Sequence, residues 1–324
     1  MQQADTAVIV LNWNGRQHLE TCLASVCRQD SVRAKIFLVD NGSRDGSVEY
    51  VRNSFPEVTI VANKKNVGFA EGNNIGIRAV LEDSTIRFIA VLNNDTEVDA
   101  GWLRALHTAI ERDVRIGAVA SRMMNFFQRD VFDSAGDYLL PHAFKVVTRG
   151  AGEKDRGQYA EENECFIARG GAALYRREML EDICLDGDYF DRHFFAYIED
   201  TDLSVRARLR GWKIVYAPSA VVYHKVSATV NTLASTFRLF HSGRNRIFFA
   251  IKNLPISLWP AAVRDRAALA AGTGGTLVRA WLFIRIGVAA LIALPRLFRQ
   301  RLVIGHRRTL TKRDILDWQR MFSI

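Results

Sequence analysis

Short apolar runs alternate with longer amphipathic stretches through the first 120 residues, and this alternation constrains the fold more than any other feature. The runs are almost wholly apolar and rich in Val, Ile and Leu, and they lie at 7–11, 36–39, 58–62, 88–92 and 116–120. Helical patterns separate them, at 17–28, 44–53, 69–82 and 100–112. Apolar strands that alternate with helices predict a parallel sheet covered on both faces, and hence an α/β fold.

Clusters of polar residues follow three of these predicted strands, at Asn12–Asn14, Asp40–Ser43 and Asn93–Glu97. One such cluster is ordinary turn chemistry. The carboxyl ends of parallel strands meet at one edge of the sheet, however, and open α/β sheets bind their ligands there. Three clusters in succession therefore predict a binding site. Neither G-x-G-x-x-G nor G-x-x-x-x-G-K-[ST] occurs, so this is not an evident NAD enzyme or P-loop nucleotidase.

Carboxylates and one histidine are the candidates for chemistry. Asp95 can supply an oxygen ligand to a divalent cation, or it can cap the helix that follows. In residues 199–202, E-D-T-D, one carboxylate can act as a general base, or the group can merely begin a helix, where the macrodipole favours acidic residues. His224 together with Asp95 would suit Mn²⁺ or Mg²⁺, and otherwise it is a surface or core residue. Residues 125–165 predict a flap or hairpin without chemistry.

Six motifs in fixed order resemble the inverting family-2 glycosyltransferases, and their rhamnosyltransferase-like branch in particular. The motifs are V-I-V-L-N-W-N-G (8–15), V-D-N-G-S-R-D-G-S (39–47), N-V-G-F-A-E-G-N-N-I-G-I (66–77), L-N-N-D-T-E-V (92–98), R-G-G-A-A-L-Y-R-R-E (169–178) and F-F-A-Y-I-E-D-T-D-L-S-V-R-A-R-L-R-G-W-K-I-V-Y-A-P (194–218). The resemblance covers roughly residues 6–250. It implies the GT-A fold, with a Rossmann-like mixed sheet, and transfer of a sugar from a nucleotide-diphosphate donor.

The resemblance also implies roles for individual residues. Asp200 would be the catalytic base, with Glu199 beside it. Asp95 stands in the family's D-x-D motif and, with His224, would hold the Mn²⁺ or Mg²⁺ that bridges the donor diphosphate. Asn93 replaces the first acidic residue of that motif, which we interpret as a feature of this branch. Donor binding is implied for Asn12, Asn14, Asp40, Asn73, Asn74, Asn93, Asp95 and Gly171.

Basic residues are concentrated at the C-terminal end. The formal net charge is +9, but residues 1–236 carry −4 and residues 237–324 carry +13. Such asymmetry points to a polyanionic partner, either nucleic acid or an anionic membrane. Because most of the motifs lie in the acidic part, we predict a GT-A catalytic domain at 1–236 and a basic, amphipathic helical region at 237–324. The expected partner of that region is an anionic membrane surface, not nucleic acid.

Residues 277–298 are the most apolar part of the basic region. Their longest charge-free run, Ile286–Pro295, has 10 residues, against the ~20 that span a bilayer, and we expect Pro295 to break the helix. An amphipathic helix in the membrane interface is therefore favoured over a span. A helical subdomain packed on the catalytic core is the other interpretation. Residues 244–246, R-N-R, either meet the diphosphate of an acceptor or are solvated helix charges.

These features together predict an enzyme of polysaccharide or glycolipid assembly. The best single choice of donor is dTDP-L-rhamnose, with a UDP-sugar as the alternative, and the expected acceptor is a glycan or a polyprenyl-linked glycan. No basic segment precedes the first strand, so we expect no signal peptide and a peripheral location on the cytoplasmic face of the membrane. A nucleic-acid-binding protein is a distant alternative that leaves Asp95 and Asp200 unexplained. A sugar nucleotidyltransferase would require a Gly-rich basic loop where this chain has N-W-N-G-R-Q.

Overall fold

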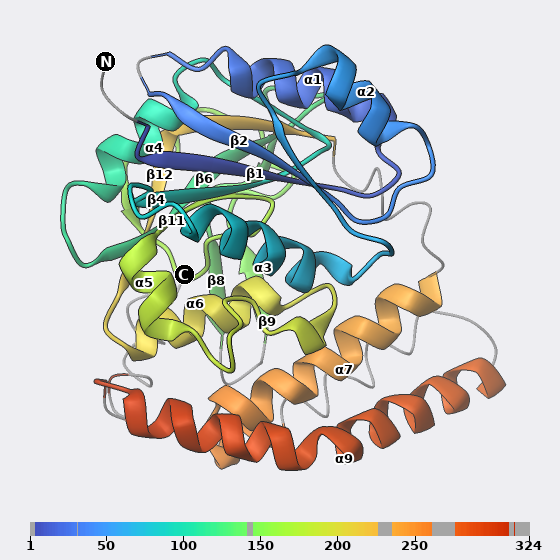
Figure 1. Ribbon diagram of the computed structural model, residues 1–324. Coiled ribbons are helices and arrows are strands. Elements are labelled where there is room, and N and C mark those ends of the chain that lie inside the picture. The colour runs from blue at the N-terminus through green and yellow to red at the C-terminus, as the bar shows by residue number, and fades with distance from the viewer. Residues whose placement is uncertain are drawn as a thin grey trace.

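A mixed sheet of ten strands forms the centre of the molecule (Figure 1). The computed structural model describes residues 4–30, 32–140, 145–225, 235–260, 276–310 and 314. The strand order is β10-β12-β6-β11-β4-β1-β2-β3, with β5 paired to β12 and β7 paired to β6, and β8 and β9 form a separate hairpin. The strands are β1 (Thr6–Asn12), β2 (Ala34–Asp40), β3 (Thr59–Ala62), β4 (Phe88–Asn93), β5 (Thr96–Val98), β6 (Ile116–Asn125), β7 (Phe132–Ser134), β8 (Asp137–Leu140), β9 (Lys145–Thr148), β10 (Asn163–Glu164), β11 (Ala172–Arg176) and β12 (Lys213–His224).

Only part of the sheet is parallel. The strands β1 to β4 run parallel to one another, as the sequence predicts. The fifth predicted strand, within β6, is separated from β4 by β11, which runs antiparallel to both. The five predicted strands therefore share one direction, and the antiparallel β11 between them makes the sheet mixed, as the resemblance implies. Every residue of β11 is buried, so its sequence pattern does not reveal whether the strand pairs in parallel or antiparallel.

Helices cover both faces of this sheet, as predicted (Figure 1). Val8 and Val10 of β1 belong to one hydrophobic core, and Ala7 and Ile9 belong to the core on the opposite face. Burial on both faces explains why the strand reads as an unbroken apolar run. The helices of the first face are α1 (Arg16–Cys27), α2 (Ser47–Ser54) and α4 (Trp102–Ile110). Those of the second are α3 (Gly68–Leu81), α5 (Arg177–Ile183) and α6 (Glu199–Leu209).

Two long helices, α7 (Ser235–Asn253) and α9 (Thr276–Arg307), make up most of the described part of the basic region. They lie side by side (Figure 1), and their contacts show that they run in the same direction. Those contacts join Phe240 to Arg285 and Ile251 to Arg301. The side of α9 that is buried carries Leu282, Ile286, Ala290 and Leu297. The remaining residues of this predicted helical region, 261–275, 311–313 and 315–324, lie outside the described residues.

The helix α9 continues through Pro295, so the expectation that it breaks there is wrong. A proline leaves the carbonyl four residues earlier without its helical hydrogen bond. Pro295 and Leu291 are both exposed, and water can satisfy that carbonyl. As a result, residues 280–307 form a helix that is long and apolar enough, by length and composition, to cross a membrane, and it contains an 18-residue window with a mean hydropathy of 1.8.

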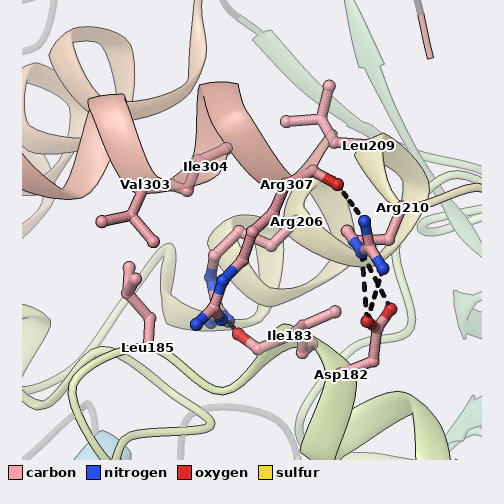
Figure 2. A pocket seen from close by; sticks show the side chains of 9 residues that line it. All are labelled: Asp182, Ile183, Leu185, Arg206, Leu209, Arg210, Val303, Ile304 and Arg307. Carbon is pink, nitrogen blue, oxygen red and sulfur yellow. Dashed lines mark hydrogen bonds and ion pairs between the residues drawn. The ribbon is translucent and has the colours of Figure 1, made fainter. Parts of the chain in front are cut away.

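The C-terminal end of α9 is fastened to α5 and α6 (Figure 2). Arg210, just after α6, donates to the carboxylate of Asp182 over distances of 2.8 to 3.1 Å, and it also donates to the main-chain carbonyl of Arg307. Arg307 donates in turn to the carbonyl of Cys184 at 2.9 Å. This end of α9 is therefore held against the α/β part of the molecule.

A buried ion cluster joins α7 to α6 and to the loop before it. The Nζ of Lys252 in α7 lies 2.8 Å from Asp191 and 2.9 Å from Asp202, and all three side chains are at most 3% exposed. Arg206 pairs with Asp202 at 2.9 Å, and Arg296 of α9 pairs with Asp191 at 3.1 Å. Burial alone would raise the pKa of Asp191, but Lys252 and Arg296 hold it well below its usual range.

We expect Lys252→Met to lower the free energy of unfolding by about 3–5 kcal/mol, because it leaves two buried carboxylates short of a cation. The measurement is the thermal unfolding midpoint of the purified protein. Lys213→Met is the matched control, since Lys213 pairs with Asp113 at the surface, where loss of a pair has little effect. Equal shifts of the midpoint in the two variants would contradict a structural role for the cluster.

Candidate active site

The strand ends on one edge of the sheet open into a cavity of about 680 Å³. Its walls come from the loops after β1, β2 and β4, the β8–β9 hairpin, the start of α6, the end of β12 and one side of α7. The predicted site residues that it brings together are Asn93, Asp95, Gly171, Glu199, Asp200 and His224. The cavity lies where the polar clusters predicted a binding site, at the carboxyl ends of the strands.

Asp95 and His224 meet because β5 pairs with β12. The strand β5 begins directly after Asp95, and its antiparallel register places Thr96 opposite His224. The Nε2 of His224 lies 3.3 Å from Oδ1 of Asp95. The Nδ1 of the same ring lies 2.8 Å from Oδ2 of Asp133. Asp133 belongs to the segment in which the sequence indicated no chemistry, and the structure places it against a predicted site residue.

The His224 ring is thus held between two carboxylates. Burial alone would lower the pKa of His224, but the hydrogen bonds to Asp133 and Asp95 raise it to about 9. On the side of Asp95, the pair offers one oxygen and one nitrogen ligand at the cavity wall, a set that a divalent cation such as Mn²⁺ accepts. On the other side, Asp133 fixes the orientation of the imidazole, as carboxylates behind metal-binding histidines do. The residues present therefore fit a divalent cation.

Behind the cavity, buried side chains connect the ends of β1, β2 and β4. Asn94 donates to Oδ1 of Asn12 at 2.6 Å, and Asn12 donates to Oδ2 of Asp40 at 2.9 Å. The other oxygen of Asp40 accepts the main-chain N–H of Ser43 at 2.8 Å. Asn12 and Asp40 are therefore placed behind the cavity wall, where they hold the turn that carries Asp95.

Three more residues for which donor binding is predicted lie away from the cavity wall. Asn14 is exposed, and its side chain accepts a main-chain N–H of the turn after β2 at 2.9 Å. Asn73 donates to the carbonyl of Phe69, and Asn74 donates to the carbonyl of Phe190, both from buried positions on α3. These side chains support the loops around the cavity, and a direct contact with the donor stays a prediction.

The loop before α6 has an unusual backbone. Phe195, Tyr197 and Ile198 have φ angles of 65°, 73° and 73°. Such angles favour glycine and are rare for a β-branched residue such as isoleucine. A backbone in these regions costs of order 1–3 kcal/mol per residue, and it persists only where surrounding contacts fix it. Glu199 and Asp200 follow at once, so this loop sets their position.

Asn245 of α7 fixes that loop. Its side chain is completely buried. Its Nδ2 lies within 2.9 Å of three carbonyl oxygens, those of Phe194, Ala196 and Tyr197. The sequence does not reveal this role, because the pattern of a basic helix does not distinguish a solvated asparagine from one that binds a distant loop. The catalytic candidates therefore depend on a residue of the basic region.

The two adjacent carboxylates have different surroundings. Glu199 is 6% exposed, and burial together with the charge of Asp200 raises its pKa well above the usual value. Among the residues that the structure describes, no hydrogen-bond partner is present for Oε2 of Glu199. Asp200 is half-buried, and its Oδ2 accepts the main-chain N–H of Gly170 at 3.2 Å. The protonated form is thus favoured for Glu199, and Asp200 is the member that can accept a proton from a ligand.

Arg169 and Asp137 also line the cavity, and the sequence analysis assigned no role to either. The Nε of Arg169 donates to Asp137 at 3.0 Å, and its guanidinium lies 3.6 Å from Asp133. Burial is the main cause of the raised pKa of Asp137. In the sequence, Arg169 opens the motif at 169–178, and Asp133 and Asp137 flank Gly136, which has a φ of 95° in a tight turn.

A second group of possible metal ligands lies at the base of α6. Asp188, Asp191 and His193 have ligand atoms within 4.8 Å of one another. Each carboxylate already has a cationic partner, however, since Arg192 pairs with Asp188 and Lys252 pairs with Asp191. These cations neutralise the group, so we assign it to the buried ion cluster.

Residues 7–184 match the sequence profile of glycosyl transferase family 2. The chain belongs to this family. It is accordingly a nucleotide-sugar glycosyltransferase of an inverting family, and the resemblance noted in the six motifs is confirmed.

Two curated relatives of this glycosyltransferase cover most of its length. The N-acetylglucosaminyl-diphospho-decaprenol L-rhamnosyltransferase of Mycobacterium tuberculosis is 25% identical over an alignment of 279 residues. The alignment covers 79% of this chain and 87% of that protein. The low-salt glycan biosynthesis hexosyltransferase Agl10 of Haloferax volcanii is 22% identical over 284 residues, 87% of this chain and 84% of that protein. These identities are too low to fix the donor of this glycosyltransferase.

Two solved structures share its fold. The mannosyltransferase PcManGT from Pyrobaculum calidifontis, in complex with GDP-Man and Mn²⁺, has a TM-score of 0.54 at 18% identity and covers 94% of this chain and 85% of its own. GalNAc-T7 with UDP, GalNAc and Mn²⁺ has a TM-score of 0.57 at 15% identity and covers 82% of this chain and 54% of its own. Likenesses at this identity concern the fold alone, and the predicted GT-A fold is confirmed.

Proposed function

We propose that this glycosyltransferase moves L-rhamnose from dTDP-L-rhamnose to a glycan or polyprenyl-linked acceptor in the assembly of cell-envelope polysaccharide. The observation that carries the proposal is that Asp200 and the Asp95–His224 pair line one cavity. A leaving diphosphate and an attacking hydroxyl need these two kinds of partner. The M. tuberculosis relative is by name an L-rhamnosyltransferase, which supports the choice of sugar. A UDP-linked galactosyl, glucosyl or N-acetylhexosaminyl donor is the alternative.

Two other classes of function, a nucleic-acid-binding protein and a sugar nucleotidyltransferase, fit the chain less well. Membership of family 2 accounts for the motifs that a nucleic-acid-binding protein left unexplained. It equally accounts for the first loop, N-W-N-G-R-Q, which did not suit a sugar nucleotidyltransferase.

In this proposal, Asp95 and His224 would hold a Mn²⁺ or Mg²⁺ ion. When bound, that ion offsets the negative charge that grows on the leaving group. Asn93 leaves a single carboxylate in the D-x-D position, and the imidazole of His224 supplies the second protein ligand. Gly171 leaves room for the side chain of Asn93 at the cavity wall, since a Cβ at Gly171 would lie 3.2 Å from Nδ2 of Asn93.

Asp200 acts as the general base. It takes the proton of the acceptor hydroxyl while that oxygen attacks the anomeric carbon of the donor from the face opposite the diphosphate. The bond from the anomeric carbon to the diphosphate oxygen breaks in the same displacement, and the anomeric configuration inverts. Glu199, for which burial favours the protonated form, stays beside Asp200 without competing for that proton.

We place the exposed face of α9 in the membrane interface. The large apolar residues of that face are at least 43% exposed and recur at helical spacing: Val278, Trp281, Ile284, Val288, Leu291, Ile292, Phe298 and Leu302. The opposite face packs on α7, and Arg296 and Arg299 pair with Asp191 and Asp186, so the helix lies along the protein. A helix with these properties favours peripheral binding to the anionic cytoplasmic leaflet over a span.

We expect Asp200→Asn to lower kcat by about 10²–10⁴-fold, because the acceptor hydroxyl loses its base, and to leave donor affinity nearly unchanged. The measurement is release of nucleoside diphosphate from a panel of nucleotide sugars, with and without Mn²⁺ or Mg²⁺, beside calorimetric binding of the donor. Asp130→Asn, at a position 63% exposed, is the control. Turnover like the wild type in Asp200→Asn would remove Asp200 as the base. No release from any donor, even with lipid-linked acceptors, would count against the proposed function.

We expect Asp133→Asn to weaken Mn²⁺ binding by about 10–100-fold, because His224 loses the carboxylate that orients its ring. Calorimetric titration of Mn²⁺ in the presence of dTDP measures this. Asp130→Asn again serves as the control, three residues away on the exposed side of the same segment. Unchanged Mn²⁺ affinity in Asp133→Asn would show that Asp133 does not support a metal site.

We expect the double variant Ile284→Gln and Leu291→Gln to bind vesicles of phosphatidylglycerol and phosphatidylcholine at least 10-fold more weakly, because each removed side chain contributes roughly 1–3 kcal/mol when buried in lipid. Sedimentation with the vesicles measures this. Val114→Gln and Phe127→Gln, equally exposed positions of the α/β part, provide the control. Equal binding by all variants would refute the interfacial role of α9. Digestion of the chain by protease added to intact spheroplasts would refute the cytoplasmic location.

A further inference from the structure

One stripe of α7 faces the cavity. Arg238, Ser242 and Arg246 line it, and they stand four residues apart in sequence, on the same side of the helix. Arg238 is exposed and Arg246 is half-buried. The stripe therefore presents two guanidinium groups and a hydroxyl to whatever occupies this end of the cavity.

The neighbouring Arg244 is not part of this stripe. It donates to the carbonyls of His193 and Phe194 at 2.8 and 2.9 Å, and so it supports the strained loop together with Asn245. The two arginines of the R-N-R motif therefore have different functions. Arg244 belongs to the structural contacts of the loop, whereas Arg246 lies on the cavity wall.

The other cations of the cavity lining are already committed to carboxylates. Arg169 pairs with Asp137 and Asp133, and His224 lies between Asp133 and Asp95. For Arg238, in contrast, no carboxylate lies within ion-pair distance in the described part of the chain. Arg238 consequently gives the α7 wall a cation that can attract an anion to this end of the cavity.

The opposite side of α7 packs on α9. Gly243 lies so close to Ile286 that a Cβ at Gly243 would meet it at 2.9 Å, and Arg285 stacks on the ring of Phe240. Figure 1 shows α7 between α9 and the body of the molecule. The exposed apolar face of α9 lies beyond. One helix layer therefore separates the basic stripe from the face that we place in the membrane interface.

We propose that Arg238, Ser242 and Arg246 bind the diphosphate that links the acceptor sugar to its lipid. The proposal rests on the proposed function and deepens it, because it assigns the acceptor end of the cavity. Guanidinium groups bind phosphate oxygens through paired, charge-assisted hydrogen bonds, and the hydroxyl of Ser242 can donate one more. The donor diphosphate belongs to the Asp95–His224 wall, so the two diphosphates of the reaction bind at different walls. A lipid chain leaving the α7 wall has the bilayer close by.

The test is binding of tritiated farnesyl diphosphate in equilibrium dialysis, with Mn²⁺ and saturating dTDP or UDP present to fill the donor site. We expect the dissociation constant to rise at least 10-fold in Arg238→Gln/Arg246→Gln. The matched control is Arg104→Gln/Arg112→Gln, which removes two exposed arginines eight residues apart on the far face of the sheet. Its dissociation constant stays that of the wild type.

Other arms of the experiment decide between sources of the diphosphate. We expect inorganic pyrophosphate to compete at least 10-fold more weakly than unlabelled farnesyl diphosphate, and equal competition would make this a site for free phosphates. Complete displacement of farnesyl diphosphate by either nucleotide, or unchanged binding in the double variant, would overturn the proposal. Binding is scored without turnover, so these outcomes are separate from a failure of the proposed function, which appears as absence of donor cleavage. In turnover assays we expect the double variant to raise KM for a prenyl-diphosphate-linked sugar and not for the octyl glycoside of the same sugar.

Discussion

The contact of Lys252 with Asp191 and Asp202 is the interaction on which the geometry of the cavity depends. Asp202 stands two residues after Asp200 in α6, and Asp191 precedes the strained loop, so one ammonium group holds both ends of the segment that presents Asp200, the proposed base. Asn253 adds a hydrogen bond to Asp202 at 2.8 Å. Burying charges costs several kcal/mol per ion unless the geometry of the pairing is excellent. Docking of α7 therefore adds a buried cation that both carboxylates share, beside Arg206 for Asp202 and Arg296 for Asp191.

It follows that the basic region is more than a means of attachment to a membrane. Its helix α7 supplies Lys252 to the ion cluster, Asn245 to the strained loop, and Arg238 and Arg246 to the cavity wall. The boundary proposed at residue 236 follows a change of composition, and the cavity crosses it. A truncation at that point would remove one wall of the cavity along with α9.

The elements and the edge of the sheet that carries the site could be predicted, because both follow from local patterns: apolar runs, and polar clusters at their ends. What could not be predicted depends on contacts between distant segments. The order of the strands turns on β11, whose uniform burial hides its direction. Asp133 lies in an irregular segment and is defined by its distance to His224, 91 residues away. Asn245 and Lys252 resemble solvated residues of a basic helix until their partners, about 50 and 60 residues earlier, are known.

In the proposed function, the charges of the cavity also give the donor diphosphate and the acceptor diphosphate different binding partners. At the β4 and β12 wall, Asp95 and Asp133 flank His224, so in the proposed function a phosphate there would meet carboxylates, and Asp95 and His224 would hold the divalent cation that offsets its charge. At the α7 wall, Arg238 and Arg246 can meet a phosphate directly. A leaving group must be released after transfer, and an exchangeable ion allows that. In the proposed function, the acceptor hydroxyl must stay within hydrogen-bond reach of Asp200, and arginine side chains that belong to the protein can hold the acceptor there. The two walls would therefore bind the two diphosphates through different kinds of cation, an exchangeable metal ion at one wall and guanidinium groups at the other.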